Sequence, residues 1–202
     1  MLIDTDHLHF WIQAIRQSPD PMRTMDAFWQ GQLSSKEWLI SSLNYWIDDF
    51  VTVDIHGGWV GVLASLLFQS KTGPNYKHIR SVDIDPTCEP IATMMNKKEE
   101  ISGRFRAVTA DMCNIRSDAN VIINTSCEHI TQNQFDLWKA GMPYNSLLVL
   151  QSNNYDIPEH VRTASSLEEF KNQCNINVTW AGELKLPLYT RYMVIGKNNE
   201  SK

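Results

Sequence analysis

The stretch VTVDIHGGWVGVLASLL, residues 51–67, decides the fold. It begins with β-branched residues, which are typical of a buried strand, and it ends in an apolar run that fits a buried helix. Between them, three glycines surround Trp59. A glycine-rich turn lets the backbone approach a ligand that a Cβ atom would block, and the helix start after it offers free N–H groups. Taken alone, the stretch fits a ligand site and a tight turn without a ligand equally well.

Strands and helices alternate after residue 50. Strands are expected at 51–55, 79–84, 105–109, 119–124, 146–151, 177–185 and 190–196, and helices at 60–70, 86–100, 132–140 and 166–173. The last two strands follow each other without a helix, and Pro187 should lie outside their ladder. This order predicts an α/β fold: a doubly wound, mostly parallel seven-stranded sheet with an antiparallel last strand.

An aromatic-rich segment precedes the first strand. Helices are expected at 6–18 and 22–47, so we expect residues 1–50 to form a helical N-terminal extension packed on a core of residues 51–202. The aromatic side chains either pack these helices onto the core or cover a ligand as a lid.

The composition restricts the class of protein. The chain has 202 residues, a net charge of -5 and four cysteines, none of them in a CxxC pair. An acidic chain does not favour a large nucleic-acid surface. The cysteine spacing predicts free thiols and no metal site. The sequence contains no apolar run long enough for a membrane span and no pattern of a targeting signal. We therefore expect a cytoplasmic protein without a membrane partner.

Three strands are expected to end near an acid, namely Asp54, Asp83 and Asp111. Asp83 is placed to accept hydrogen bonds from both hydroxyls of a ribose. Asp85 precedes a proline and is expected to cap a helix. Asp111 could accept from an adenine amino group while Met112 packs the ring, or it could be a turn residue. Because the strict dinucleotide turn and a phosphate cradle are both missing, these acids favour a cationic ribose-bearing ligand such as S-adenosylmethionine.

At these positions the sequence resembles the class I S-adenosylmethionine-dependent methyltransferases, which have a Rossmann-like fold. The resemblance covers residues 50–196. The first motif of that family, an acid followed by alternating glycines, stands here as DIHGGWV, residues 54–60, with His56 and Val60 in place of the outer glycines. The resemblance implies cofactor contacts by Asp54, His56, Gly57, Gly58, Trp59, Asp83, Ile84, Asp111, Met112, Asn124 and Thr125. It also makes residues 51–202 the methyltransferase domain.

The resemblance implies methyl transfer, with a small molecule rather than nucleic acid as the expected acceptor. Asn124 is not followed by the prolines and aromatic residue of enzymes that methylate amino groups of nucleic acids. His129, Glu128 and His56 are weak candidates for a catalytic base, and the roles of a cap or a packed side chain are favoured. Cys127 is interpreted as a structural thiol.

Other positions and functions remain open. Tyr155, His160, Tyr189 and Arg191 could line an acceptor pocket. A noncatalytic cofactor-binding or interaction module would also explain the altered glycine motif. Aminopropyl transfer on the same fold is less favoured, because the turn that begins at Asn124 lacks the acids that would hold a polyamine. The sequence does not predict an oligomeric state.

Overall fold

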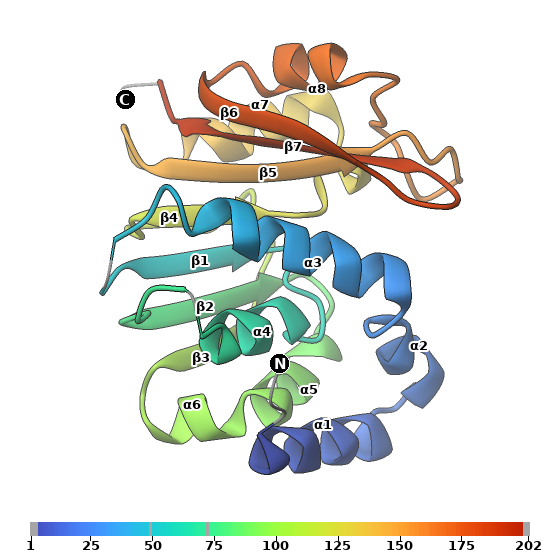
Figure 1. Ribbon diagram of the computed structural model, residues 1–202, viewed down its shortest axis with the longest axis vertical. Helices are drawn as coiled ribbons and strands as arrows, with labels where there is room; N and C mark the ends of the chain where they lie inside the picture. Colours follow the sequence, from blue (N-terminus) through green and yellow to red (C-terminus); the bar gives the residue numbers. More distant parts are fainter. Residues whose placement is uncertain (1–3, 49, 72, 200–202) are drawn as a thin grey trace. The chain divides into compact units, whose positions relative to one another are not determined.

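The computed structural model describes residues 4–48, 50–71 and 73–199. The chain forms two compact units; the first ends at Asp111 and the second begins at Met112. A seven-stranded sheet has the strand order β3-β2-β1-β4-β5-β7-β6 (Figure 1). This order confirms the expected Rossmann-like α/β fold. The boundary expected at residue 50 stays a prediction.

The first unit contains three parallel strands. They are β1 (Thr52–His56), β2 (His78–Asp83) and β3 (Phe105–Thr109), and β2 pairs with both others. Helix α4 (Val62–Gln69) connects β1 with the loop before β2. Its side chains from Val62 to Leu67 are all buried, which explains why this segment has no polar face.

The helix expected at 86–100 is two helices, α5 (Cys88–Met95) and α6 (Lys97–Ile101). Asn96 separates them because its side-chain amide donates to the carbonyl of Gly61, at 3.0 Å, and to that of Ala92, at 2.9 Å. The expected cap at Asp85 was also wrong, since α5 begins two residues later than predicted. The carboxylate of Asp85 instead accepts from the backbone N–H of Thr87, at 2.9 Å, and orders the turn before the helix.

The N-terminal segment forms three helices, α1 (Thr5–Gln17), α2 (Pro21–Asp26) and α3 (Gln30–Leu43). The single helix expected at 22–47 is therefore interrupted. Asp20 caps α2, with its side chain accepting from the backbone N–H of Arg23 at 3.0 Å. Trp29 has an extended backbone before α3, so the chain changes direction between the two helices.

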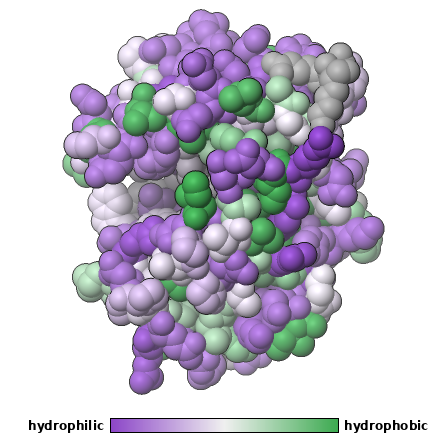
Figure 2. All heavy atoms as spheres, turned by 180° about the vertical axis from the view of Figure 1, so that it is seen from behind, coloured by the Kyte–Doolittle hydropathy of each residue, from purple (hydrophilic) through white to green (hydrophobic). Residues whose placement is uncertain are grey.

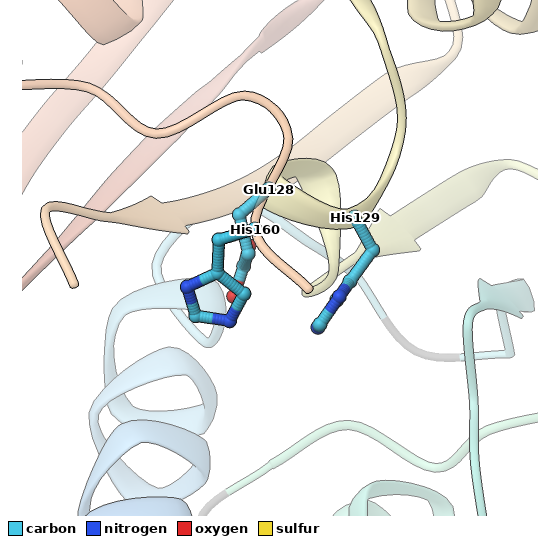
Figure 3. Close-up of side chains that lie close together, drawn as sticks. All are labelled: Glu128, His129 and His160. Carbon is cyan, nitrogen blue, oxygen red and sulfur yellow. The ribbon is translucent and has the colours of Figure 1, made fainter. Parts of the chain in front are cut away.

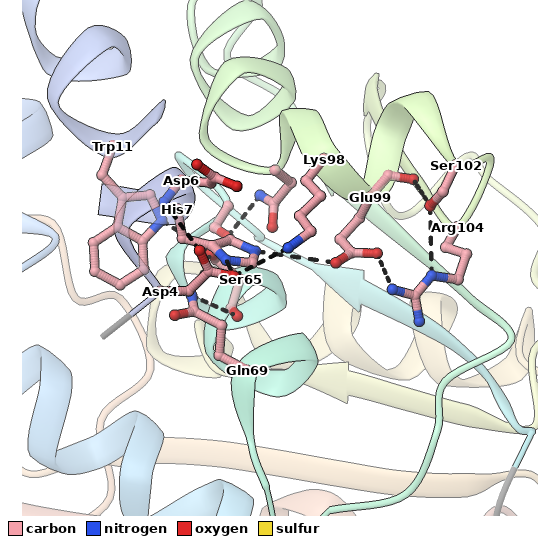
Figure 4. Close-up of polar contacts among 12 residues, drawn as sticks. Asp4, Asp6, His7, Trp11, Ser65, Gln69, Lys98, Glu99, Ser102 and Arg104 are labelled. Atoms are coloured by element: carbon pink, nitrogen blue, oxygen red, sulfur yellow. Dashed lines mark hydrogen bonds and ion pairs between the residues drawn. The ribbon is translucent and has the colours of Figure 1, made fainter. Parts of the chain in front are cut away.

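A polar network ties the first helix to α6 and to Arg104, the residue before β3 (Figure 4). Asp4 accepts from the Lys98 ammonium at 3.0 Å and lies 3.2 Å from Nδ1 of His7. The Lys98 hydrogen bond is the main cause that lowers the pKa of Asp4 to about 2. Glu99 lies 4.0 Å from Nε2 of His7 and pairs with Arg104. The beginning of α1 is thus fixed to α6 and Arg104 by charged groups.

Two further contacts hold the extension on the first unit. The indole N–H of Trp11 donates to the hydroxyl of Ser65 in α4, at 2.9 Å. Arg23 of α2 forms an ion pair with Asp85 after β2, at 2.7 Å. The extension therefore packs on α4 and reaches the turn that follows β2, whereas its role as a lid stays a prediction.

The second unit contains β4 (Val121–Asn124), β5 (Leu147–Asn153), β6 (Asn177–Lys185) and β7 (Thr190–Lys197). β4 and β5 are parallel, and β7 runs antiparallel to both β5 and β6. This confirms the expected reversed last strand. Pro187 lies in the turn between β6 and β7, as expected, where the backbone N–H of Leu186 donates to the carbonyl of Tyr189 at 2.9 Å.

Helices α7 (Gln132–Ala140) and α8 (Leu167–Cys174) complete the second unit, together with the short helix η1 (Cys127–His129). Phe135, Trp138 and Phe170 from the two long helices are fully buried in one hydrophobic core with β5 and β7. At the surface, apolar residues are interspersed among hydrophilic ones on the face that Figure 2 shows. Among the described residues, none of the helices combines the length and the apolar character that crossing a membrane requires.

Candidate functional site

The loop between β1 and α4 has an unusual backbone. Gly57, Trp59 and Gly61 all have positive φ values, of 65°, 49° and 79°. Glycine adopts such angles without a steric cost, whereas tryptophan does so rarely. The glycines at 57 and 61 therefore allow the chain to turn sharply, and the strained Trp59 marks the loop as a functional candidate.

Gly58 is required for a different reason. A Cβ atom at this position would overlap Oγ of Ser81 in β2 and lie 3.2 Å from its Cβ. The backbone N–H of Gly58 donates to the carbonyl of Val82 at 3.0 Å, which holds the loop against β2. The missing side chain thus permits the close approach of this loop to the second strand.

Asp83 orders the same loop from the end of β2. One carboxylate oxygen accepts from the backbone N–H of Trp59 at 2.7 Å, and the other accepts from that of Asp85 at 3.0 Å. Each carboxylate oxygen has a second lone pair, so both can still accept from a ligand hydroxyl. Asp83 is half-buried, and the side chain of Ile84 beside it is exposed. This edge can therefore offer paired acceptors next to an apolar surface.

Asp54 lies inside β1 rather than at its end. Both of its oxygens accept from the guanidinium of Arg80, its register partner in β2; the Nε–Oδ1 distance is 2.9 Å. Nε2 of His56 lies 4.0 Å from the same carboxylate. A ligand ammonium would have to share the Asp54 carboxylate with Arg80. The predicted role of Asp54 in cofactor binding is untested.

His56 is fully buried. Burial is the main cause that lowers the pKa of His56 to about 4, although the nearby Asp54 carboxylate opposes this shift. The imidazole is therefore neutral at pH 7. Its complete burial fits a packed side chain, one of the roles considered for His56 in the sequence.

Asp111 follows β3 and is half-buried. The backbone N–H of Ala110 donates to the carbonyl of Asp83 at 2.9 Å, which brings the chain before Asp111 beside the end of β2. Asp83 and Asp111 thus belong to neighbouring strand ends within the first unit, as the sequence predicted. Adenine recognition by Asp111 stays a prediction.

In the second unit, Asn124 ends β4 and is fully buried. Its side-chain oxygen accepts from the backbone N–H of Ser126 at 2.9 Å, and its amide group lies 3.5 Å from the sulfur of Met112. The carbonyl of Thr125 accepts from the guanidinium of Arg191. Asn124 and Met112 therefore lie together, while the cofactor contacts that the resemblance implied for them are untested.

Glu128 forms a buried ion pair. Its Oε1 accepts from Arg191 at 2.9 Å and from the side-chain amide of Asn153 at 2.7 Å. The neighbouring Cys127 is fully buried, and burial raises the pKa of its thiol to about 12. A thiol with this pKa is not a nucleophile at neutral pH, which agrees with the structural role expected for Cys127.

Three positions expected to line an acceptor pocket, Tyr155, His160 and Tyr189, lie close together, and His129 lies beside His160. The rings of His129 and His160 are 4.8 Å apart between centroids, and Tyr155 packs on Tyr189 at 5.5 Å. Tyr155 also lies 6.2 Å from His160. The structure thus brings these side chains into one polar and aromatic cluster after β4 and β5.

Sequence reasoning missed two features of these sites. The pairing of Asp54 with Arg80 could have been found from the parallel register of β1 and β2, which places the two residues opposite each other. The proximity of His129 and His160 had only a weak signal, namely that each follows a strand of the expected, mostly parallel sheet. The two imidazole rings lie 4.8 Å apart between centroids, a proximity that the sequence alone does not show.

Solved structures of methyltransferases share the fold of this chain. NodS, an N-methyltransferase from Bradyrhizobium japonicum WM9 in complex with S-adenosyl-L-homocysteine, has a TM-score of 0.65 at 13% identity; the match covers 94% of this chain and 99% of NodS. The mitomycin 7-O-methyltransferase MmcR has a TM-score of 0.64 at 14% identity, with 93% of this chain covered. This chain spans 60% of the length of MmcR.

A third similar structure is the magnesium protoporphyrin IX methyltransferase ChlM from Synechocystis PCC 6803 with bound S-adenosylmethionine. Its TM-score is 0.56 at 15% identity, and the match covers 80% of this chain and 75% of ChlM. No protein-family model and no curated protein matches the sequence. These comparisons show that the chain has the Rossmann-like fold of class I methyltransferases, of which NodS was solved with S-adenosyl-L-homocysteine and ChlM with S-adenosylmethionine.

Proposed function

We propose that this protein is an S-adenosylmethionine-dependent methyltransferase with a small-molecule acceptor. The observation that carries the proposal is the loop after β1, which Asp83 holds in place with two backbone hydrogen bonds, at 2.7 and 3.0 Å. Asp83 keeps acceptor capacity for the two ribose hydroxyls. Small-molecule methyltransferases with the same fold support the choice of cofactor and acceptor class.

The reaction is an in-line displacement. A nucleophilic atom of the acceptor attacks the methyl carbon, the bond between carbon and the sulfonium sulfur breaks, and its electron pair stays on sulfur as the neutral thioether of S-adenosylhomocysteine. The protein then mainly has to position the acceptor and exclude water. A hydroxyl or protonated amine must also lose a proton.

His129 is the candidate that best fits a base. Glu128 is already paired with Arg191, and His56 is fully buried. By contrast, His129 is exposed, and its Nδ1 lies 3.1 Å from the carbonyl of Glu159, which leaves Nε2 as the basic nitrogen. The extension of residues 1–50 selects the acceptor in this proposal, since Arg23 reaches the turn after β2.

Calorimetric titration with S-adenosylmethionine tests the cofactor assignment. Replacing Asp83 with Ala should weaken binding about ten- to a hundredfold, because charge-assisted hydrogen bonds to the ribose are lost. The matched control Asp85→Ala, two residues away, removes the contact with Arg23 and should leave the affinity within about twofold of that of the unchanged protein. Binding of NAD without binding of S-adenosylmethionine would overturn the assignment.

Turnover separates the proposal from its main alternative. Formation of S-adenosylhomocysteine should depend on an added hydroxyl- or amine-bearing small molecule. Tight cofactor binding without product across such a panel would instead indicate a noncatalytic cofactor-binding module. We further propose a cytoplasmic location, supported by four cysteines of which none forms a disulfide bond.

A further inference from the structure

Glu128, His129 and His160 form a compact cluster in the second unit. Glu128 and His129 belong to η1, and His160 lies in the loop after β5. One potential ligand atom from each residue lies within 4.8 Å of the other two. Figure 3 shows the three side chains projecting into the same region from these two segments.

Only one of the two carboxylate oxygens of Glu128 has hydrogen-bond donors among the described residues. Its Oε1 accepts two hydrogen bonds, whereas Oε2 is buried and accepts none from the described residues. The whole residue is only 2% exposed. A buried carboxylate oxygen without a partner is costly, so its lone pairs indicate a missing donor or cation.

Both histidines have the same ring nitrogen beside a backbone carbonyl. Nδ1 of His129 lies 3.1 Å from the carbonyl of Glu159, and Nδ1 of His160 lies 2.7 Å from that of Tyr155. A carbonyl only accepts, so each Nδ1 carries the hydrogen and each Nε2 keeps a lone pair. Backbone carbonyls fix the tautomer and orientation of metal-binding histidines in this way.

We propose that Glu128 Oε2, His129 Nε2 and His160 Nε2 bind one divalent transition-metal ion. Two imidazoles and one carboxylate suit Zn²⁺, Mn²⁺, Fe²⁺ or Co²⁺ and leave coordination positions open. Ligand atoms about 2.1 Å from a metal lie roughly 3–3.5 Å apart, so the cluster must contract on binding. His129 is exposed and His160 is half-buried, which allows their rings to move, while Arg191 and Asn153 hold Glu128.

The guanidinium of Arg191 lies 2.9 Å from the other oxygen of Glu128 and opposes a cation. We therefore expect micromolar rather than nanomolar affinity. Metal binding here would contradict our expectation from the sequence that the protein has no metal site, which is untested. Open positions could take a hydroxyl oxygen and lower its pKa. That use at an acceptor rests on the proposed function and would take the place of His129 as the base, because Nε2 of His129 would then bind the metal. Metal binding itself does not rest on the proposed function.

Titration of the full-length protein with Co²⁺, followed by absorption spectroscopy and calorimetry, tests the site. One ion per chain should bind without thiolate bands. His129→Ala and His160→Ala should each weaken binding at least tenfold. His9→Ala is the matched control, because His9 is an exposed histidine in α1, and it should leave binding unchanged.

Absence of Co²⁺ binding at millimolar concentration would overturn the proposal, and so would binding that persists in the His129→Ala/His160→Ala variant. Because both substitutions are at accessible rings, the melting temperature of the metal-free variants should stay near that of the unchanged protein. Titration with S-adenosylmethionine in the absence of metal is the separate readout for the proposed function. Absence of Co²⁺ binding would therefore leave the proposed function untouched, and absence of S-adenosylmethionine binding would leave the metal site untouched.

Discussion

Substitution of Gly58 by Ala should destabilise the protein through a single steric conflict. The added Cβ would overlap Oγ of Ser81 and lie 3.2 Å from its Cβ. Rotation of the Ser81 side chain can move Oγ but not Cβ, and Ser81 is buried. Gly58 does not have a positive φ, so backbone strain adds little. Overpacking of this kind costs about 1–3 kcal/mol of unfolding free energy.

A double-mutant cycle isolates this conflict. Ser81→Gly removes both clashing atoms, so the double variant Gly58→Ala/Ser81→Gly should recover about 1–3 kcal/mol relative to the sum of the single changes. Urea denaturation measures the unfolding free energy of each variant. Each kcal/mol should also shift the melting temperature by about 2–4 °C in a chain of this size.

Gly103→Ala provides the control for the cycle. Gly103 has a φ of 75°, but nothing lies within 4 Å of a Cβ at this position. Its cost is backbone strain, which Ser81→Gly should not relieve. If Gly58→Ala and Ser81→Gly add within about 0.5 kcal/mol, the close approach of the loop to β2 does not explain the glycine.

Burial lowers the pKa of His56 from its ordinary value of 6.5 to about 4, so the unfolded chain binds more protons between these values. Stability should thus fall by up to about 3 kcal/mol as the pH drops from 7 to 4, and His56→Asn should flatten this dependence in denaturation curves. Among the four cysteines, Cys113 alone is not buried, so a thiol reagent should modify one thiol rapidly in the native protein and none in Cys113→Ser. Trp11→Phe removes the 2.9 Å hydrogen bond to Ser65 and should cost about 1 kcal/mol in thermal unfolding, whereas an unchanged melting temperature would mean that this contact does not anchor α1.

The alternation of strands and helices was predictable because each segment carries its own local signal. The bounds expected for β3 and β6 agree with the structure, at Phe105–Thr109 and Asn177–Lys185. The break between α5 and α6 was not predictable in this way. It depends on the amide of Asn96 reaching the carbonyl of Gly61, 35 positions away in the sequence. Tertiary hydrogen bonds of this kind override local helix propensity.

The candidate site was predictable to a similar degree. Asp83 and Asp111 could be selected as candidate ligand-binding residues from the sequence, because ligands bind at the carboxyl ends of parallel strands. The partners of these side chains were not predictable, since they depend on strand register and loop geometry. Asp54 shows the consequence: its position in the motif suggested a ligand contact, while the register placed Arg80 against its carboxylate.

The hydrogen bonds from Trp59 and Asp85 to Asp83 have a consequence for how a ligand would bind. They restrain the loop after β1 before any ligand arrives, so little conformational entropy remains to be lost on association. The amide of Trp59 should accordingly exchange slowly with deuterium in the free protein, with only a small further slowing in the complex. We therefore expect the ligand to bind to a preorganised loop, with little change of the backbone conformation on binding.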